Sequence, residues 1–319
     1  MGPLSAGCDG ATSPTEEDTP PLLPAGEHRI ELVHGGRNRF ALLHVPPQAH
    51  SGEPLPLVLA LHGGGGHPEH FRDTSGLSHE ADREGFLVLY PAGTGFLPDR
   101  LLTWNASPEC CGSARDHGVD DVGFLLALVD EVSRRTRVAE WSVFLTGHSN
   151  GAMLALRVAE EAPDRIRAVV SVGGVRTADP SPPPTPVPLL LIHSLDDAHA
   201  PYEGGKGLPF PGTEGPGINH VPVGVTLDAW RRANGCPLSP RIVEVREGTP
   251  GTPDAGQQAE RLVWEECSGA PLEHWRLTGV GHGWPGAPPG VLDLGPTTTL
   301  LRAAEEGWAF FARVRALQP

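Results

Sequence analysis

Short, continuous apolar runs recur along the chain and are separated by longer amphipathic stretches. The runs lie at residues 57–61, 86–90, 143–145, 168–172 and 189–192. Runs of this kind are typical of strands buried on both faces of a parallel sheet. The stretches between and after them have helical spacing, notably residues 122–135, 152–161 and 297–315. This alternation predicts an α/β fold with a mostly parallel, doubly wound sheet and helices on both faces.

The N-terminal part of the chain differs from this pattern. Residues 29–33 and 40–45 are short β-prone runs around a turn-rich connection, which predicts an antiparallel hairpin of edge strands. Residues 1–26 lack hydrophobic periodicity and are rich in Pro, Thr and Glu, so we expect a disordered tether. Residues 27–319 are then expected to form a single catalytic domain.

Charge excludes several classes of partner. The chain has 24 Lys plus Arg against 39 Asp plus Glu, a formal net charge of −15. Such a balance repels phosphate backbones and anionic lipid headgroups, so no nucleic acid and no direct membrane-surface binding are expected. The sequence also lacks any apolar stretch of about 18 residues that would span a membrane. No cysteine spacing resembles a four-ligand zinc site, and we expect no metal and no cofactor.

The cysteines bear on the compartment. Cys236 and Cys267 could staple a long excursion before the last strand, and a disulfide there would imply export. Cys110 and Cys111 are adjacent in a loop, and the sequence leaves open whether they pair elsewhere or stay reduced. The run ending at Cys8 resembles the end of a bacterial lipoprotein signal, so one hypothesis is a lipid anchor at Cys8; the alternative is an arbitrary cysteine in a floppy tail. We expect an exported protein, either extracellular or in the cell envelope.

A nucleophile motif follows the strand at 143–145. Gly147-His148-Ser149-Asn150-Gly151 has the pattern G-x-S-x-G and precedes a helix. This pattern places a serine at a strained strand-to-helix turn, where side chains at positions 147 and 151 would strike the neighbouring strand and helix. Ser149 is therefore the candidate nucleophile, and the backbone N–H of Asn150 is a candidate oxyanion donor.

A second oxyanion donor is expected in the glycine run after the strand at 57–61. His62-Gly63-Gly64-Gly65-Gly66 matches the H-G-G-G type, in which a backbone N–H approaches the substrate. Gly64 is the preferred donor, although Gly63 or Gly65 could serve. The lysine and the serine or threonine of a phosphate-binding loop are absent, which disfavours nucleotide binding.

The acid and the base should follow later strands, because the order in this fold is Ser, acid, His. Asp196 and Asp197 both follow the strand at 189–192, and the residues alone leave the choice open. Asp120 and Asp121 precede the nucleophile and are expected to cap the helix at 122–135. His282 lies between glycines after a short strand at 275–277 and is the candidate base. His62, His67 and His148 are plausible loop residues or residues that support the catalytic groups.

With these motifs in place, the sequence resembles a known family: the secreted polyhydroxybutyrate depolymerase and feruloyl or acetylxylan esterase group of α/β-hydrolases. The resemblance covers roughly residues 36–290. The motifs that carry it, in order, are Leu61-His62-Gly63, Tyr90-Pro91, Trp104-Asn105-Ala106, Cys110-Cys111-Gly112, Val119-Asp120-Asp121-Val122-Gly123-Phe124, Gly147-His148-Ser149-Asn150-Gly151, Asp197 through Pro201-Tyr202, Asn234-Gly235-Cys236 and Gly281-His282-Gly283-Trp284-Pro285-Gly286.

The resemblance resolves the choice of acid. In this family the acid usually stands four residues after a histidine and four before a proline, which implies Asp197. The chain departs from the family at Ser194, Leu195, Ala200 and Gly283, where Gly, Thr, Val and Thr are common. None of these departures removes a reacting group, but Gly283 could loosen the histidine loop.

These residues together predict a serine-dependent carboxylic ester hydrolase that works through an acyl-enzyme and resembles polyhydroxybutyrate depolymerases. A feruloyl or acetylxylan esterase acting on plant cell-wall esters is the alternative, and transacylation is a further possibility. A catalytically silent ligand-binding lipoprotein is an alternative of another class. Trp104, Tyr202 and Trp284 are candidates for a wall that binds the acyl group of the ester, against the alternative of ordinary packing.

Overall fold

The computed structural model describes residues 22–95, 97, 100–177, 182–209, 217–289 and 293–317. Most of the expected tether, including Cys8, lies outside these residues, so the tether and its lipidation stay predictions. No helix in the described part of the chain is long and apolar enough to cross a membrane.

A ten-stranded sheet organises the molecule, in the order β1-β2-β4-β3-β5-β6-β7-β12-β11-β10. The six strands from β4 to β12 in that order are parallel, and antiparallel strands flank them on both sides. The strand bounds are β1 Gly26–His34, β2 Arg37–Val45, β3 Leu55–Leu61, β4 Leu87–Pro91, β5 Val138–His148, β6 Ala168–Val172, β7 Leu189–Ser194, β10 Arg241–Glu247, β11 Gln258–Trp264 and β12 Leu272–Thr278. A separate pair is formed by β8 Gly205–Lys206 and β9 Asn219–His220.

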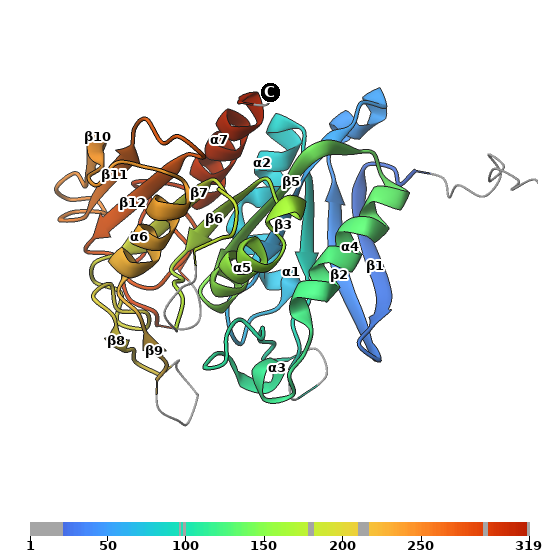
Figure 1. The fold of residues 1–319 in the computed structure, drawn as a ribbon, viewed down its shortest axis with the longest axis horizontal. Helices are drawn as coiled ribbons and strands as arrows, with labels where there is room; N and C mark the ends of the chain where they lie inside the picture. The colour runs from blue at the N-terminus through green and yellow to red at the C-terminus, as the bar shows by residue number, and fades with distance from the viewer. Residues whose placement is uncertain are drawn as a thin grey trace, which may run out of the picture.

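Helices cover both faces of the sheet, because successive residues of each central strand point to opposite sides. In β3, Leu57 and Leu59 join a core that includes residues of α4, α5 and α6, whereas Val58 and Ala60 join a core that includes residues of α1, α2 and α7. In Figure 1, α4, α5 and α6 lie on the face toward the viewer. The helix bounds are α1 Pro68–Ser75, α2 Leu77–Glu84, α3 Gly112–Asp116, α4 Asp121–Arg135, α5 Asn150–Glu161, α6 Val223–Ala233 and α7 Ala303–Ala316. The predicted doubly wound α/β fold is confirmed.

Three details differ from the sequence prediction. The predicted hairpin is present, but only β1 is an edge strand, since β2 also pairs with β4. The prediction named no strand at β10, where the apolar side chains of Ile242, Val243 and Val245 are exposed rather than buried. Helix α7 begins at Ala303 rather than at Thr297, because the preceding residues form the support for a loop described below.

The predicted disulfide between Cys236 and Cys267 is present. It closes a segment that contains the β10–β11 hairpin at the far edge of the sheet. The other two described cysteines behave differently from both outcomes considered, because the structure joins the sulfur atoms of Cys110 and Cys111 to each other.

Replacing both Cys236 and Cys267 with serine is expected to lower the free energy of unfolding by about 3–4 kcal/mol. The cysteines are 31 residues apart, and a cross-link of that span removes conformational entropy mainly from the unfolded chain. Urea unfolding of the oxidised wild type and the double variant measures the difference. An unchanged unfolding midpoint would contradict a stabilising role for this bond.

Candidate active site

Ser149 occupies a strained turn between β5 and α5. Its backbone has φ 54° and ψ −120°, a conformation that L-residues rarely adopt. A Cβ on Gly147 would lie 2.6 Å from the carbonyl carbon of Gly151, and a Cβ on Gly151 would lie 2.4 Å from the carbonyl oxygen of Leu61. Any side chain at these two positions would clash. Gly147, near the end of β5, faces the start of α5, and Gly151, in the first turn of α5, faces the end of β3, as the nucleophile motif predicts.

The structure brings Ser149, His282 and Asp197 together, although they come from three separate loops. The Ser149 Oγ lies 2.8 Å from Nε2 of His282, and Nδ1 of His282 lies 2.6 Å from Oδ2 of Asp197. All three residues are buried, with exposed fractions of 4%, 1% and 4% for Ser149, His282 and Asp197. With Nδ1–H donating to the carboxylate, Nε2 is left as the acceptor for the serine hydroxyl.

The surroundings of Asp197 favour its ionised, hydrogen-bond-accepting form. Its other oxygen, Oδ1, accepts hydrogen bonds from the backbone N–H groups of His199 and Ala200, at 2.9 and 2.8 Å. Burial opposes ionisation, but the electrostatic interaction and hydrogen bond with His282, with the hydrogen bond from the N–H of Ala200, outweigh it and hold the pKa of Asp197 well below its usual range.

Asp196, the alternative acid in the sequence, has another role. Its side chain is exposed, and Oδ2 accepts a hydrogen bond from the backbone N–H of Gly279, at 2.7 Å. Gly279 lies just after β12, so Asp196 ties the β7 loop to the start of the loop that contains His282. The geometry therefore favours Asp197, as the family resemblance implies.

The loop that contains His282 is held by residues 294–298, directly before and at the predicted start of the last helix. The N–H of Gly281 donates to the carbonyl of Pro296, and the N–H of His282 donates to the carbonyl of Leu294, both at 2.7 Å. Further along, Gly286 N–H donates to the carbonyl of Thr298 at 3.0 Å. The predicted helix would begin at Thr297, but the carbonyls of Thr297 and Thr298 accept hydrogen bonds from Gln257 and Gly286, and α7 begins later than predicted.

The glycine loop after β3 lies beside the nucleophile. The N–H of Gly65 donates to Leu102 and that of Gly66 donates to Gly63, which favours Gly63 or Gly64 as the donor to a substrate. A Cβ on Gly64 would lie 3.5 Å from the Cβ of Asn150, so Gly64 and Asn150 are neighbours, as an oxyanion site requires.

His62 stabilises this loop. Its Nε2 accepts a hydrogen bond from the N–H of Gly93 at 3.1 Å, so Nδ1 bears the proton and donates to the carbonyl of Gly63 at 2.8 Å. Burial lowers the pKa of His62 to about 4, so the ring is neutral near pH 7.

The three aromatic residues considered as a substrate wall are placed by packing contacts. Trp104 is completely buried, and its indole N–H donates to the carbonyl of His62 at 2.8 Å. Trp284 is 6% exposed and donates to the carbonyl of Ser75 at 3.0 Å. Tyr202 is partly buried, and its hydroxyl lies 3.0 Å from Nε2 of His274. For Trp104, which has none of its surface exposed, and for the other two, these contacts support the packing alternative.

Three further histidines lie around the site: His193 and His199 are buried, and His148 is partly buried. His148 has its Nε2 2.7 Å from the carbonyl oxygen of His282, and the ring of His199 has its centroid 5.6 Å from that of His282. His193 lies 3.5 Å from Oδ2 of Asp197. The sequence contains one signal for this cluster, which is that His193 stands four residues before Asp197. The contacts of His148 and His199 depend on the tertiary fold.

The arrangement of Ser149, His282 and Asp197 is suited to covalent catalysis by the serine. No group of three or more His, Cys, Asp or Glu residues that could hold a metal ion occurs within the described ranges. A hydroxyl hydrogen-bonded to an imidazole, which is in turn hydrogen-bonded to a buried carboxylate, can attack a carbonyl carbon.

Comparison with known proteins agrees with this geometry. The family model described as esterase PHB depolymerase matches residues 39–180. NocK of Nocardia uniformis subsp. tsuyamanensis, a protein named as an esterase, is 33% identical over 279 residues, which cover 83% of this chain and 76% of NocK. An acetylxylan esterase of Coprinopsis cinerea is 26% identical over 287 residues, which cover 83% of this chain and 71% of that protein.

A solved structure shows the same fold. Acetyl xylan esterase from Aspergillus awamori matches with a TM-score of 0.58 and 16% identity, over 89% of this chain and 99% of that chain. The resemblance inferred from the ordered motifs is confirmed by the family model and by the similarity to NocK, which extends over most of both proteins. The chain therefore belongs to the esterase PHB depolymerase family, with the α/β-hydrolase fold.

Proposed function

We propose that this protein hydrolyses carboxylic esters, with Ser149 as nucleophile, His282 as general base and acid, and Asp197 as the carboxylate that orients the imidazole. The observation that carries the proposal is the continuous hydrogen-bonded chain from Ser149 Oγ through His282 to Asp197. Membership of an esterase family supports the same chemistry.

The reaction follows from these contacts. His282 Nε2 accepts the Ser149 hydroxyl proton as Oγ attacks the ester carbonyl carbon, and the carbonyl oxygen becomes an oxyanion. The N–H groups of Gly64 and Asn150 are the proposed donors to that oxyanion. Collapse of the tetrahedral intermediate breaks the ester C–O bond, and the alcohol leaves with the proton from His282. Water then attacks the acyl-Ser149 by the same route and releases the carboxylic acid.

The acyl group is proposed to be short: hydroxybutyrate oligomers or acetyl groups on polysaccharide. The matching family model is described as a PHB depolymerase esterase, and two of the similar proteins are named acetylxylan esterases. Feruloyl esters are the second choice. A flat aryl group requires an accessible apolar wall, and the aromatic side chains considered for that wall mostly make packing contacts.

Export is proposed on separate grounds. The Cys236–Cys267 bond persists in oxidising compartments, whereas cytosolic proteins usually keep their thiols reduced. Extracellular or cell-envelope placement is consistent with a polymeric ester as substrate.

The function is tested with purified wild type and Ser149→Ala on three substrates: a hydroxybutyrate oligomer, acetylated xylan and methyl ferulate. We expect wild type to turn over at least one of them and Ser149→Ala to turn over none. The ratio of the three rates assigns the acyl group. Adding acceptor alcohols and searching for transfer product distinguishes hydrolysis from transacylation.

Labelling with a fluorophosphonate separates an enzyme from a silent ligand-binding protein. The probe phosphonylates a serine that is activated by its base, with loss of fluoride, so wild type should be labelled and Ser149→Ala should not. A folded wild type that neither reacts with the probe nor hydrolyses any of the three esters would overturn the proposal.

A further inference from the structure

The side chain of Asn150 is turned away from the substrate side and into the protein. It is 2% exposed, its Oδ1 accepts a hydrogen bond from the backbone N–H of Trp104 at 2.7 Å, and its Nδ2 donates to the carbonyl of Trp104 at 3.1 Å. The amide thus pairs with both polar groups of one residue's backbone. Since the proposed oxyanion donor is the N–H of the same Asn150, the position of that N–H depends on where Trp104 is held.

Trp104 also contacts the other half of the proposed oxyanion hole. Its indole N–H donates to the carbonyl of His62, the residue directly before the glycine loop, at 2.8 Å. Its ring lies next to the imidazole of His62, with 4.8 Å between the ring centroids. One residue, outside any helix or strand, therefore contacts both segments that supply the proposed donors.

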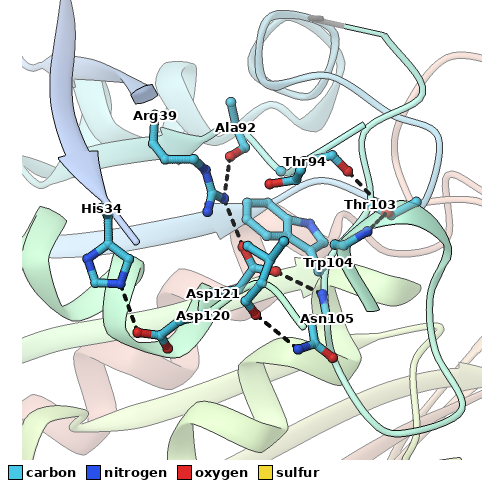
Figure 2. A network of polar contacts seen from close by, with 12 residues as sticks. His34, Arg39, Ala92, Thr94, Thr103, Trp104, Asn105, Asp120 and Asp121 are labelled. Atoms are coloured by element: carbon cyan, nitrogen blue, oxygen red, sulfur yellow. Dashed lines mark hydrogen bonds and ion pairs between the residues drawn. The ribbon is translucent and has the colours of Figure 1, made fainter. Parts of the chain in front are cut away.

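Asp121 holds the backbone directly after Trp104. Its Oδ2 accepts a hydrogen bond from the N–H of Asn105 at 2.8 Å, and the Asn105 side chain donates to the carbonyl of Val119 at 2.9 Å. The sequence predicted that Asp120 and Asp121 both cap helix α4. Only Asp120 does so, by accepting from the N–H of Gly123; Asp121 points the other way, into the loop. Figure 2 shows Asp121 between Arg39 and Asn105, and Asp120 paired with His34.

Arg39 completes the support. Its Nη2 donates to Oδ1 of Asp121 at 2.8 Å and to the carbonyl of Ala92 at 3.0 Å, and its guanidinium lies 3.8 Å from the centroid of the Phe124 ring. Ala92 begins the loop after β4, where Thr94 pairs through both backbone groups with Thr103, next to Trp104 (Figure 2). The ion pair therefore joins two segments that meet at Trp104.

Burial of the Arg39–Asp121 ion pair favours a single, hydrogen-bonded geometry. Asp121 is completely buried and Arg39 is 6% exposed. Separating two buried, oppositely charged groups is energetically costly, because each charge would then lack both its partner and water. Burial raises the pKa of the Asp121 carboxyl, and the charge of Arg39 and the hydrogen bond from Asn105 oppose that rise.

We propose that the buried Arg39–Asp121 pair positions the oxyanion hole, through Asn105 and Trp104 to the side chain of Asn150. Neither charge contacts the reacting atoms, so both are positioning residues. The inference rests on the proposed function, since it concerns the oxyanion of the same ester hydrolysis. An oxyanion donor acts mainly on the transition state, so its misplacement lowers kcat and leaves KM nearly unchanged.

The first test compares Asp121→Asn with Asp120→Asn on one soluble ester. Asp121→Asn keeps the size of the side chain but removes the charge that holds Arg39. We expect kcat to fall about 10- to 100-fold with KM within about threefold of wild type, by analogy with the loss of an oxyanion donor. Asp120→Asn is the matched control: Asn also caps helices, the side chain is exposed, and kcat should stay within about twofold.

A double-variant cycle separates this role from a loss of stability. If Asp121 acts through Asn150, then Asp121→Asn combined with Asn150→Ala should lose no more kcat than the worse single variant, whereas independent defects would multiply. The pH profile of kcat should keep its shape, because the Ser149–His282–Asp197 contacts are unchanged. Multiplied losses would overturn the proposal.

The outcomes are distinguishable from those for the function itself. If wild type shows no Ser149-dependent hydrolysis, the proposed function fails; if wild type is active and folded Asp121→Asn has wild-type kcat, only the positioning role is overturned. If Asp121→Asn does not fold, Arg39→Lys replaces it, because lysine keeps the charge but lacks the planar guanidinium that lies over the Phe124 ring while its Nη2 donates to Asp121 and Ala92. A several-fold lower kcat at unchanged KM supports the proposal, and an unchanged kcat overturns it.

Discussion

Asp197→Asn is expected to reduce kcat for ester hydrolysis by about four orders of magnitude while KM changes little. The backbone N–H groups of His199 and Ala200 both point at Oδ1 of Asp197. In the variant they will hold the amide oxygen on their side, which turns the NH₂ group toward Nδ1 of His282. Nδ1 must then accept a hydrogen bond, the proton moves to Nε2, and Nε2 can no longer accept the proton of Ser149.

Asp196→Asn is the matched control, since it changes the adjacent residue in the same way. Its exposed side chain accepts only from the N–H of Gly279 among the described contacts, and an asparagine oxygen can do the same. The control should keep kcat within about threefold of wild type. If Asp196→Asn is the inactive variant, or if Asp197→Asn keeps more than about a tenth of wild-type kcat, the assignment of the acid is wrong.

Much of the fold was predictable because burial acts locally on strands of this kind. β3 and β7 are covered on both faces, so residues 57–61 and 189–192 are all apolar and each run is visible in the sequence. The strand β10 is at the sheet edge with exposed Ile242 and Val243, so neither continuous burial nor a clear alternation marks it. The start of α7 was misplaced because the carbonyls of Thr297 and Thr298 bind Gln257 and Gly286, which are contacts between distant segments.

The residues of the site also fall into those that local sequence predicts and those that it does not. Ser149 and its flanking glycines were predictable because the turn itself demands them, and His282 because of its order in the chain and its glycine setting. The role of Asp121 was not predictable: its partners Arg39 and Asn105 are 82 and 16 residues away, and only the packing of α4 against the sheet brings them together. Trp104 was read as a candidate wall because aromatic residues near a site suggest stacking, yet its indole fills the interior beneath the glycine loop.

The second large effect concerns stability: the free energy of unfolding is expected to fall by roughly 3–4 kcal/mol for each pH unit between about pH 6 and 5. Burial lowers the pKa values of four histidines, to about 4 for His62 and His220 and to about 3 for His148 and His274. In an unfolded chain each would titrate near pH 6.5. Between these values the unfolded chain binds a proton that the folded protein does not, so stability is present above about pH 6.5 and is lost as pH falls.

Other groups reduce the net effect without reversing it. Hydrogen bonding to Glu27 raises the pKa of His44, and burial raises that of Glu160 to about 7, so both bind protons more readily in the folded state. His193 adds to the four histidines, since burial lowers its pKa as well. The balance is a net uptake of roughly three protons on unfolding, each equivalent to about 1.4 kcal/mol per pH unit.

Urea unfolding at pH 7.5, 6.0 and 5.0 measures this slope, and His274→Gln tests its origin. In the folded protein the hydroxyl of Tyr202 donates to Nε2 of His274, and Nδ1 donates to the carbonyl of Leu191, so a second ring proton would meet a donor. Glutamine does not titrate, so the variant should lose about one proton, or about 1.4 kcal/mol per pH unit, from the slope even if its stability at pH 7.5 is lower. A stability that is flat from pH 7.5 to 5.0 in wild type would mean that these rings are protonated in the folded state, and then their buried contacts must differ from the ones described.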